Sequence, residues 1–146
     1  MRIALGADHA GFKLKEHLRE RLGEWGHEVL DLGTHSTDSV DYPQFGAAVG
    51  RAVVQGHAEL GVALCGSGIG ICIAANKVVG VRAAQAWDSL SAKLAREHND
   101  ANVLCFGERL IGFDTATAAL EAFLAASFLG GRHERRVDQL LALEKP

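Results

Sequence analysis

The sequence predicts an α/β domain in which a parallel sheet is covered by helices on both faces. Five short apolar runs alternate along the chain with longer segments that carry apolar residues at helical spacing. Parallel strands need crossover connections, and strands that are apolar on both faces need cover on both faces. With 146 residues, residues 1–146 fit a single domain of the three-layer, Rossmann-like, flavodoxin-sized type.

The five predicted strands are short, and each lies before or after a segment with helical periodicity. The first helix shows the pattern clearly, since Phe12, Leu14, Leu18 and Leu22 share one face, and glycines at 23 and 26 can end it. We expect strands at 2–8, 27–33, 59–65, 80–86 and 102–107.

The remaining helices are predicted from their start and stop signals. Pro43 suits the first turn of a helix over about 43–56, and Asp88 suits the N-cap of another. A short apolar helix is expected over 68–77, and a long helix from about Asp114 should end at the glycine pair 130–131. The last helix is expected over about 133–144.

Composition excludes several classes of function. A formal charge of −3 and a pI near 6.1 provide no basic surface for nucleic acid or anionic lipid. No apolar run approaches the ~20 residues that span a bilayer, and the first residues do not read as a secretory signal. The three cysteines are too scattered for a disulfide framework, a zinc site or a thioredoxin-like motif. We therefore expect a cytoplasmic protein without metal or cofactor.

Ligands of such folds bind at the carboxyl ends of the strands. Three segments stand there: GADHAG at 6–11, CGSGIG at 65–70 and GERLIG at 107–112. The second has the spacing of neither the dinucleotide fingerprint nor the Walker motif. Its glycines and the helix that follows favour an oxyanion, and the same field favours a thiolate at Cys65. The alternative is that Cys65 packs as a small hydrophobe, as we expect of Cys72 and Cys105.

Two further groups of side chains could contact a ligand. Asp8 and His9 follow the first strand and could bind hydroxyls, although Asp8 could equally cap the next helix. Arg132 and Arg136 lie four residues apart on one helix face and, with Arg109, could hold a phosphate. The alternative for the arginines is a solvated charged face.

Together these segments resemble the motifs of the ribose-5-phosphate isomerase B family, which also holds galactose-6-phosphate isomerase subunits. The motifs are GADHAGFKLK, DYP, CGSGIGICIAANK, REHNDANVLCFGER and GGRHERRV, and they cover the whole chain in the family's order. The resemblance implies a metal-independent aldose–ketose isomerase that interconverts D-ribose 5-phosphate and D-ribulose 5-phosphate.

The resemblance also implies roles for individual residues. Cys65 would be the base, and His98 would open the furanose ring. The amides of Gly66, Ser67, Gly68, Ile69 and Gly70 would hold the enediolate. Asp8, His9 and Asn99 would bind the sugar, while Arg109, Arg132 and Arg136 would bind the phosphate beside His133. Ser67 could relay a proton between the two substrate oxygens.

Two departures from the family pattern matter. Many relatives have threonine at the position of Ser67, and the hydroxyl is kept here. Another branch uses a glutamate as base at the position of Ile71, which cannot titrate. The chain therefore resembles the cysteine-dependent branch.

His98 and Asn99 precede the fifth strand, so they should lie toward the opposite edge of the sheet from Cys65. A homodimer that shares its active sites would bring them together, as the family does, and such dimers can pair into tetramers. Two other functions stay open: an isomerase of a six-carbon aldose 6-phosphate such as allose or galactose 6-phosphate, and a non-catalytic phosphosugar or nucleotide-binding module. A redox or metal protein fits the cysteine spacing less well.

Overall fold

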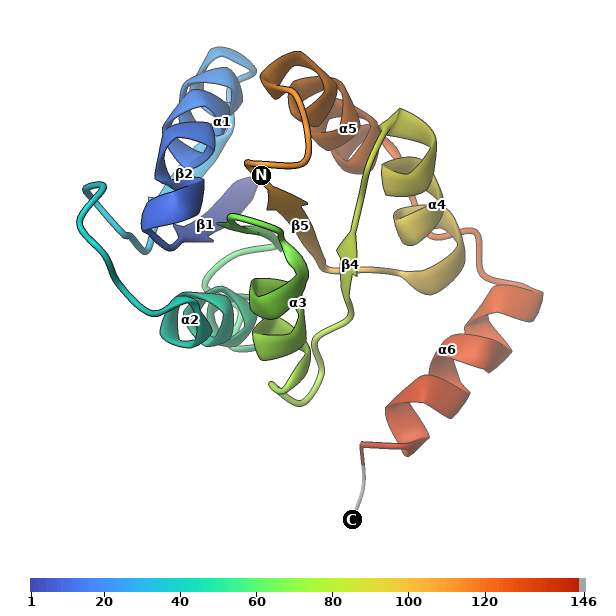
Figure 1. Cartoon of the computed structure of the whole chain (residues 1–146). Coiled ribbons are helices and arrows are strands. Elements are labelled where there is room, and N and C mark those ends of the chain that lie inside the picture. The colour runs from blue at the N-terminus through green and yellow to red at the C-terminus, as the bar shows by residue number, and fades with distance from the viewer. Residues whose placement is uncertain (145–146) are drawn as a thin grey trace.

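The computed structural model describes residues 1–144 and confirms the predicted three-layer α/β fold. Its five strands form one parallel sheet in the order β2-β1-β3-β5-β4 (Figure 1). The strands are β1 (Arg2–Ala7), β2 (Glu28–Asp31), β3 (Leu60–Cys65), β4 (Ala83–Gln85) and β5 (Val103–Gly107).

Helices cover both faces of the sheet, and the last helix extends away from the body (Figure 1). The chain makes a 3₁₀ turn η1 (His9–Gly11) and the helices α1 (Phe12–Glu24), α2 (Tyr42–Val54), α3 (Ile69–Asn76), α4 (Ser89–Asn99), α5 (Phe113–Ala125) and α6 (Arg132–Ala142). Apolar residues of α1, α4 and α5 pack on one face of the sheet, and those of α2 and α3 pack on the other.

Side-chain alternation along the strands directs Cys65 toward the α2–α3 face. In β1, Ile3 and Leu5 pack under α1 and α5, whereas Ala4 faces the opposite side. Cys65 and Cys105 belong to the same cluster as Ala4. Because successive residues of a strand point to opposite faces, the thiol of Cys65 lies on the side from which α3 begins.

The predicted helix starts at Pro43 and Asp88 are confirmed. Pro43 lies in the first turn of α2, where its missing N–H costs nothing. Asp88 caps α4: its Oδ1 accepts the Ser91 N–H at 2.7 Å, and Ser91 Oγ accepts the Asp88 N–H at 3.2 Å. This reciprocal pair satisfies two N–H groups at the helix start.

The predicted end of the long helix at the glycine pair is wrong. α5 ends at Ala125, and Ala126 has the extended backbone angles φ −85° and ψ 157°. The N–H of Leu129 donates to the carbonyl of Glu97 at 3.1 Å, so the segment after α5 is held against the last turn of α4. This contact with a distant helix redirects the chain five residues before Gly130.

The strand predicted over 80–86 is shorter than expected, because side-chain oxygens accept hydrogen bonds from backbone N–H groups in its first residues. The Gly80 N–H donates to the carboxylate of Glu144 at 3.1 Å. The Arg82 N–H donates to Asn102 Oδ1 at 2.8 Å. Pairing with β5 therefore covers only Ala83–Gln85.

A buried ion pair anchors the end of β2. Lys15 of α1 is fully buried, and its Nζ lies 2.8 Å from both carboxylate oxygens of Asp31 and 2.9 Å from Glu16 Oε1. Burial opposes ionisation of Asp31, but the hydrogen bonds from Lys15 and from the Gly33 N–H outweigh it and lower the pKa of Asp31. The loop toward α2 therefore starts from a fixed point.

Candidate active site

An open cleft lies at the carboxyl ends of β1 and β3, beside the start of α3. It brings together most of the residues predicted around Cys65. The cleft is lined by Asp8, His9, Ala10, Tyr42, Cys65, Gly66, Ser67, Ile69, Gly70, Ile73 and Arg109.

Cys65 is 4% exposed, and its sulfur is held by the loop that follows it. The N–H of Gly68 donates to Cys65 Sγ at an N···S distance of 3.1 Å. Gly68 has a φ of 78°, a left-handed conformation that favours glycine, and this conformation turns the chain into α3. The sulfur thus faces both the cleft and a backbone donor.

Two backbone hydrogen bonds fix this loop to the end of β5. The Glu108 N–H donates to the Cys65 carbonyl at 2.9 Å, and the Arg109 N–H donates to the Gly66 carbonyl at 3.0 Å. The Glu108 carboxylate also accepts the Leu14 N–H at 2.6 Å, at the start of α1. Sequence reasoning did not single out Glu108. Its backbone N–H bonds the Cys65 loop, and its side chain bonds the start of α1.

The loop amides divide into occupied and open groups. The Gly68 N–H bonds Cys65, and the Ile69 N–H donates to Ser67 Oγ at 3.2 Å. Within residues 1–144, the N–H groups of Ser67, Gly70 and Ile71 have no acceptor in the protein. Since these lie at the N-terminus of α3, where the helix dipole is positive, they form the part of the loop open to an anion.

Asp8 and His9 both line the cleft, and each also has a structural contact. Asp8 Oδ1 accepts the N–H groups of Ala10 at 2.9 Å and Gly11 at 3.1 Å, so it caps the turn η1. His9 Nδ1 lies 3.2 Å from both the N and the O of Val40. The capping role weighed for Asp8 is therefore present, and its second oxygen is left for a ligand.

Tyr42 is a cleft residue that sequence reasoning did not select. Its ring occupies the space that a β-carbon at Gly70 would fill, which packs the start of α2 against the start of α3. The DYP triplet was the available signal, because it places Tyr42 directly before the helix-starting Pro43.

Arg109 completes the cleft with a positive charge. It is exposed, its guanidinium lies beside Gly66, and it forms no ion pair with any carboxylate among residues 1–144. An unpaired guanidinium at the rim of a cleft is suited to a phosphate or carboxylate group.

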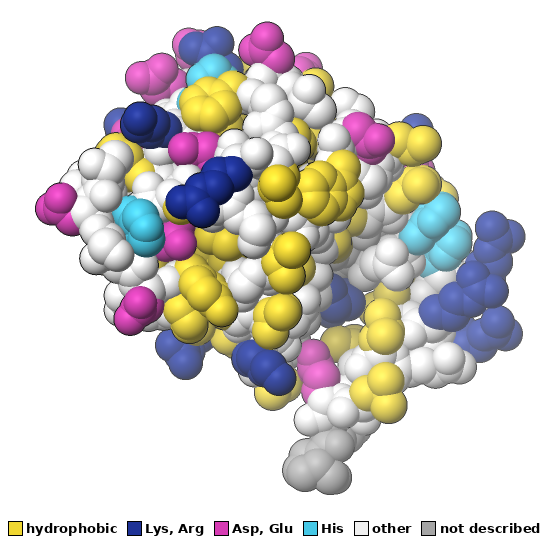
Figure 2. Space-filling model, viewed as in Figure 1, with side chains coloured by type: hydrophobic (Ala, Val, Ile, Leu, Met, Phe, Trp, Pro, Cys, Tyr) yellow, Lys and Arg dark blue, Asp and Glu magenta, His cyan; other side chains and the backbone are white. Residues whose placement is uncertain are grey.

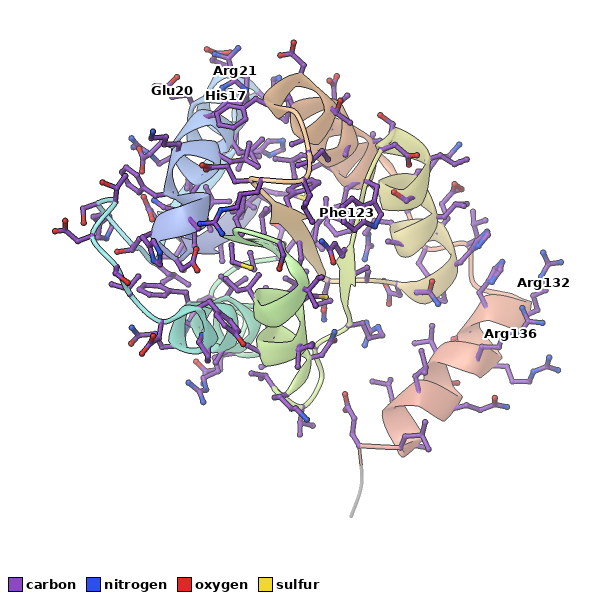
Figure 3. All side chains as sticks on the ribbon, in the orientation of Figure 1. His17, Glu20, Arg21, Phe123, Arg132 and Arg136 are labelled. Carbon is purple, nitrogen blue, oxygen red and sulfur yellow. The ribbon has the colours of Figure 1, made fainter. Side chains whose placement is uncertain are left out.

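The other predicted residues gather elsewhere, at the contact between α4 and α6. The rings of His98 and His133 stack with centroids 4.2 Å apart and planes inclined by 10°. Figure 3 shows Arg132 and Arg136 on α6 at the outer edge of the molecule, away from α3. Burial and then the charges of His98, Arg132 and Arg136 lower the pKa of His133. None of these residues lines the cleft around Cys65.

Asn99 also lies outside that cleft. It is exposed at the end of α4, and its carbonyl accepts the Arg82 Nε–H at 3.1 Å. The expectation that His98 and Asn99 lie apart from Cys65 within one chain is confirmed.

Cys72 and Cys105 form a pair behind the loop. Cys105 is fully buried, and its pKa is raised, first by the contact with Cys72 and then by burial. The pKa of Cys72 is lowered by the same contact, against the effect of burial. Cys72 Sγ also lies 3.5 Å from the Ala83 carbonyl oxygen, so both thiols pack between α3 and the sheet.

The part of the chain that the structure describes has neither a metal-binding cluster nor a membrane-spanning helix. Over residues 1–144, no group of three or more His, Cys, Asp or Glu side chains could hold a metal ion. In the same part of the chain, no helix has the length and apolar character needed to cross a membrane.

A three-layer α/β fold with a thiol, a glycine-rich loop and an Arg109 unpaired among residues 1–144 at the carboxyl edge of its sheet is suited to an enzyme that binds a small anionic molecule. The model of the Ribose/Galactose Isomerase family matches residues 3–140. The chain is 45% identical over 144 residues to ribose-5-phosphate isomerase B of Escherichia coli, covering 99% of this chain and 97% of that protein. It is 44% identical over 147 residues to ribose-5-phosphate isomerase B of Mycobacterium tuberculosis, covering 99% and 91%.

Solved structures agree with this similarity. Ribose-5-phosphate isomerase B of Clostridium thermocellum matches with a TM-score of 0.98 and 48% identity, covering 99% of this chain and 97% of that one. The Mycoplasma genitalium enzyme with bound ribulose-5-phosphate matches with a TM-score of 0.94 and 40% identity, covering 98% and 95%. The chain belongs to the ribose/galactose isomerase family.

Proposed function

We propose that this protein is an aldose–ketose isomerase that interconverts D-ribose 5-phosphate and D-ribulose 5-phosphate. The observation that carries the proposal is the cleft thiol of Cys65, held by a backbone N–H beside open amides, in a chain similar over its whole length to enzymes named ribose-5-phosphate isomerase B. The similarity supports the substrate class, and the contacts around Cys65 support its role as the base.

Proton transfer between two carbons is the central step. In the open-chain aldose, the Cys65 thiolate takes the proton from C2, and the electron pair of that C–H bond forms the C1–C2 double bond of an enediolate. The C1 carbonyl electrons move to O1 as the enediolate forms, and a proton passes from O2 to O1. Cys65 then returns its proton to C1, which leaves the carbonyl at C2. The Gly68 N–H supports this cycle because a donor to sulfur stabilises the thiolate between the two transfers.

The charge that develops on the substrate oxygens needs donors of its own. The open N–H groups of Ser67, Gly70 and Ile71 lie at the positive end of α3 and are suited to this task. The hydroxyl of Ser67 already accepts the Ile69 N–H, so its own proton is free to move between O1 and O2. Removing one such donor typically costs about 10²–10³ in rate.

Ring opening and phosphate binding involve Arg109 of the cleft and further residues that one chain keeps away from its own cleft. We assign ring opening to His98 and phosphate binding to Arg109, Arg132 and Arg136, with His133 beside them. Because His98 and the α6 arginines lie outside the cleft of their own chain, a second copy must supply them. The proposed enzyme is a homodimer with two shared sites.

The surface around the cleft supports a second copy. Ile69 is 52% exposed and Ile73 55% exposed on α3, and Trp87, Leu90 and Leu110 are also exposed. Figure 2 shows hydrophobic side chains gathered over the middle of this face, with basic side chains at the outer end of α6. Apolar surface of this kind around a cleft is typical of an interface.

The proposed activity is tested by following the conversion of ribose 5-phosphate to ribulose 5-phosphate in excess EDTA. We expect turnover that the chelator leaves unchanged, because the proposed steps use side chains and amides alone. Allose 6-phosphate and galactose 6-phosphate, assayed in parallel, should turn over more slowly. Preference for a six-carbon substrate would replace the pentose assignment, and binding of ribose 5-phosphate without turnover would contradict the enzyme.

A further inference from the structure

A single peptide unit beside the cleft is held at both ends. Its N–H, on Gly68, donates to Cys65 Sγ at 3.1 Å. Its carbonyl, on Ser67, accepts a hydrogen bond from Gln85 Nε2 at 2.6 Å. Because the peptide group is planar, a contact that fixes the carbonyl also fixes the direction of the N–H. We propose that Gln85 is a positioning residue that aims the Gly68 N–H at the reactive sulfur.

The chemistry of the contact settles how the Gln85 amide is oriented. A backbone carbonyl can only accept, so the NH₂ group of Gln85 must face Ser67. Gln85 is the last residue of β4, where it pairs in register with Cys105 of β5. The side chain is half-buried and extends from a strand of the sheet, which holds the donor in place behind the loop.

The neighbouring strand is shaped to let this contact form. A β-carbon at Gly107 of β5 would collide with the carbonyl group of Ser67. The absence of a side chain there lets the loop lie directly over the end of β5, within reach of Gln85 on β4. The two strands therefore act together on the same carbonyl.

Gln85 provides the hydrogen bond to the carbonyl end of this peptide. Gly68 has left-handed backbone angles and precedes α3, so the helix ladder does not include its N–H. Among residues 1–144, Gln85 is the only side chain that donates to the Ser67 carbonyl. Without Gln85, the peptide can tilt, and the N–H···S contact weakens.

The inference rests on the proposed function in that Cys65 is the base, and it adds a residue that touches neither substrate nor sulfur. A net hydrogen bond corresponds to about a two- to tenfold change in an equilibrium or rate. Loss of Gln85 should lower the thiolate population of Cys65 by that factor at neutral pH. It should therefore lower kcat and leave KM unchanged.

The test uses two variants of Gln85 and one control. Gln85→Met keeps the length of the side chain and removes the donor. Gln85→Glu places a carboxylate against the carbonyl oxygen, so it should have a larger effect. Gln55→Met is the matched control, because Gln55 is exposed at the end of α2. If Gln85→Met does not fold, Gln85→Asn carries the test, since its amide is one methylene shorter.

Two readouts are measured on each folded protein. The first is the rate of alkylation by iodoacetamide at pH 7, resolved by peptide mass spectrometry, with Cys72 as the internal reference for Cys65. The second is the pH profile of kcat and KM for ribose 5-phosphate. We expect Cys65 alkylation and kcat to fall about two- to tenfold in Gln85→Met and further in Gln85→Glu. The acid limb of the rate profile should move to higher pH, with Cys72 alkylation and KM unchanged.

Other outcomes overturn the inference. Equal Cys65 alkylation in wild type and Gln85→Met would remove the positioning role, and a parallel fall at Cys72 would indicate general disruption of β4. A wild-type protein that does not turn over ribose 5-phosphate would refute the proposed function, yet the alkylation ratio would still decide the role of Gln85. A Cys65 that resists alkylation in every variant would contradict both.

Discussion

The cleft around Cys65 and the basic end of α6 differ in how completely one chain builds them. Around Cys65, the loop is fixed by backbone bonds to β5 and by the Gln85 side chain. At the start of α6, Arg132 and Arg136 project outward and make no ion pair within residues 1–144. The first region is held in place by several hydrogen bonds, whereas the two arginines of the second extend from the outer edge of the molecule.

This difference supports the division of labour between two copies that we propose. A loop that handles developing charge must be rigid, because donors that reorganise during the reaction contribute less. Phosphate-binding arginines can be delivered from a neighbouring molecule, since a guanidinium needs only to reach the anion. In the proposed homodimer, the basic end of α6 of one chain completes the cleft of the other.

The largest expected effect comes from the region around Cys65. Cys65→Ala should reduce kcat for ribose 5-phosphate by at least about 10³-fold, because it removes the proposed base. Binding of the substrate, measured by calorimetry, should stay within a few-fold of wild type. Cys72→Ala is the control, and it should keep most of the activity. Near-native turnover by Cys65→Ala would show that another group is the base.

The basic end of α6 should instead affect substrate binding. Arg136→Ala is expected to raise KM about 10- to 100-fold with a smaller change in kcat, because hydrogen bonds to a charged group are lost. Arg135→Ala is the matched control, since Arg135 lies in a shallow surface with Glu134 and Asp138. Steady-state kinetics on the three proteins decides the point. Equal KM values for both variants would leave Arg136 as a solvated surface charge.

A smaller effect is expected on the free energy of unfolding, through the Lys15–Asp31 pair at the end of β2. The pKa of Asp31 is lower in the folded protein than in the unfolded chain. The stability that the Lys15–Asp31 pair contributes is therefore fully present above the unfolded pKa. It is lost as the pH falls through the folded-state pKa of Asp31. Asp31→Asn leaves the fully buried Lys15 with Glu16 as its one carboxylate partner among residues 1–144, and it should cost about 1.5–3 kcal/mol near neutral pH.

Urea denaturation of wild type and Asp31→Asn at pH 7 and pH 3 measures this difference. The gap in unfolding free energy should narrow at the lower pH. Glu28→Gln is the comparison, because the Arg2–Glu28 pair is on the surface. A gap that is the same at both pH values would mean that the Asp31 charge is not its source.

The smallest effect is a shift in the titration of His133. Burial and the charges of His98, Arg132 and Arg136 lower its pKa, so Arg136→Ala should raise that pKa. Added salt should shift it in the same direction in the wild type by screening the arginines. NMR titration of the His133 ring signals follows both. A downward shift in Arg136→Ala would contradict the electrostatic cause.

The order of elements and the Cys65 loop could be predicted from the sequence because both depend on local signals. Alternating apolar runs define strands, and glycines directly after a strand mark the ligand edge of a parallel sheet. The capping residues Pro43 and Asp88 are equally local. The separation of His98 from Cys65 followed from chain order, because a residue just before a strand lies at the opposite edge from one just after a parallel strand.

The features that sequence reasoning missed depend on contacts between distant segments. α5 ends at Ala125, and the Leu129 N–H then bonds the Glu97 carbonyl of α4. The sequence after residue 125 contains no local signal that predicts this contact. Gln85 reaches the Ser67 carbonyl only because β4 lies next to β5, a neighbour relationship fixed by strand order. Tyr42 enters the cleft through the packing of α2 on α3. Each requires the assembled sheet.

The most direct test of the shared cleft mixes two inactive proteins, Cys65→Ala and His98→Ala, under conditions where subunit exchange is verified by native mass spectrometry. In a random mixture, half of the dimers are mixed, and each mixed dimer holds one site with both Cys65 and His98 intact. The expected result is recovery of about a quarter of wild-type turnover. A fully exchanged mixture that stays inactive would contradict the claim that two chains build each site.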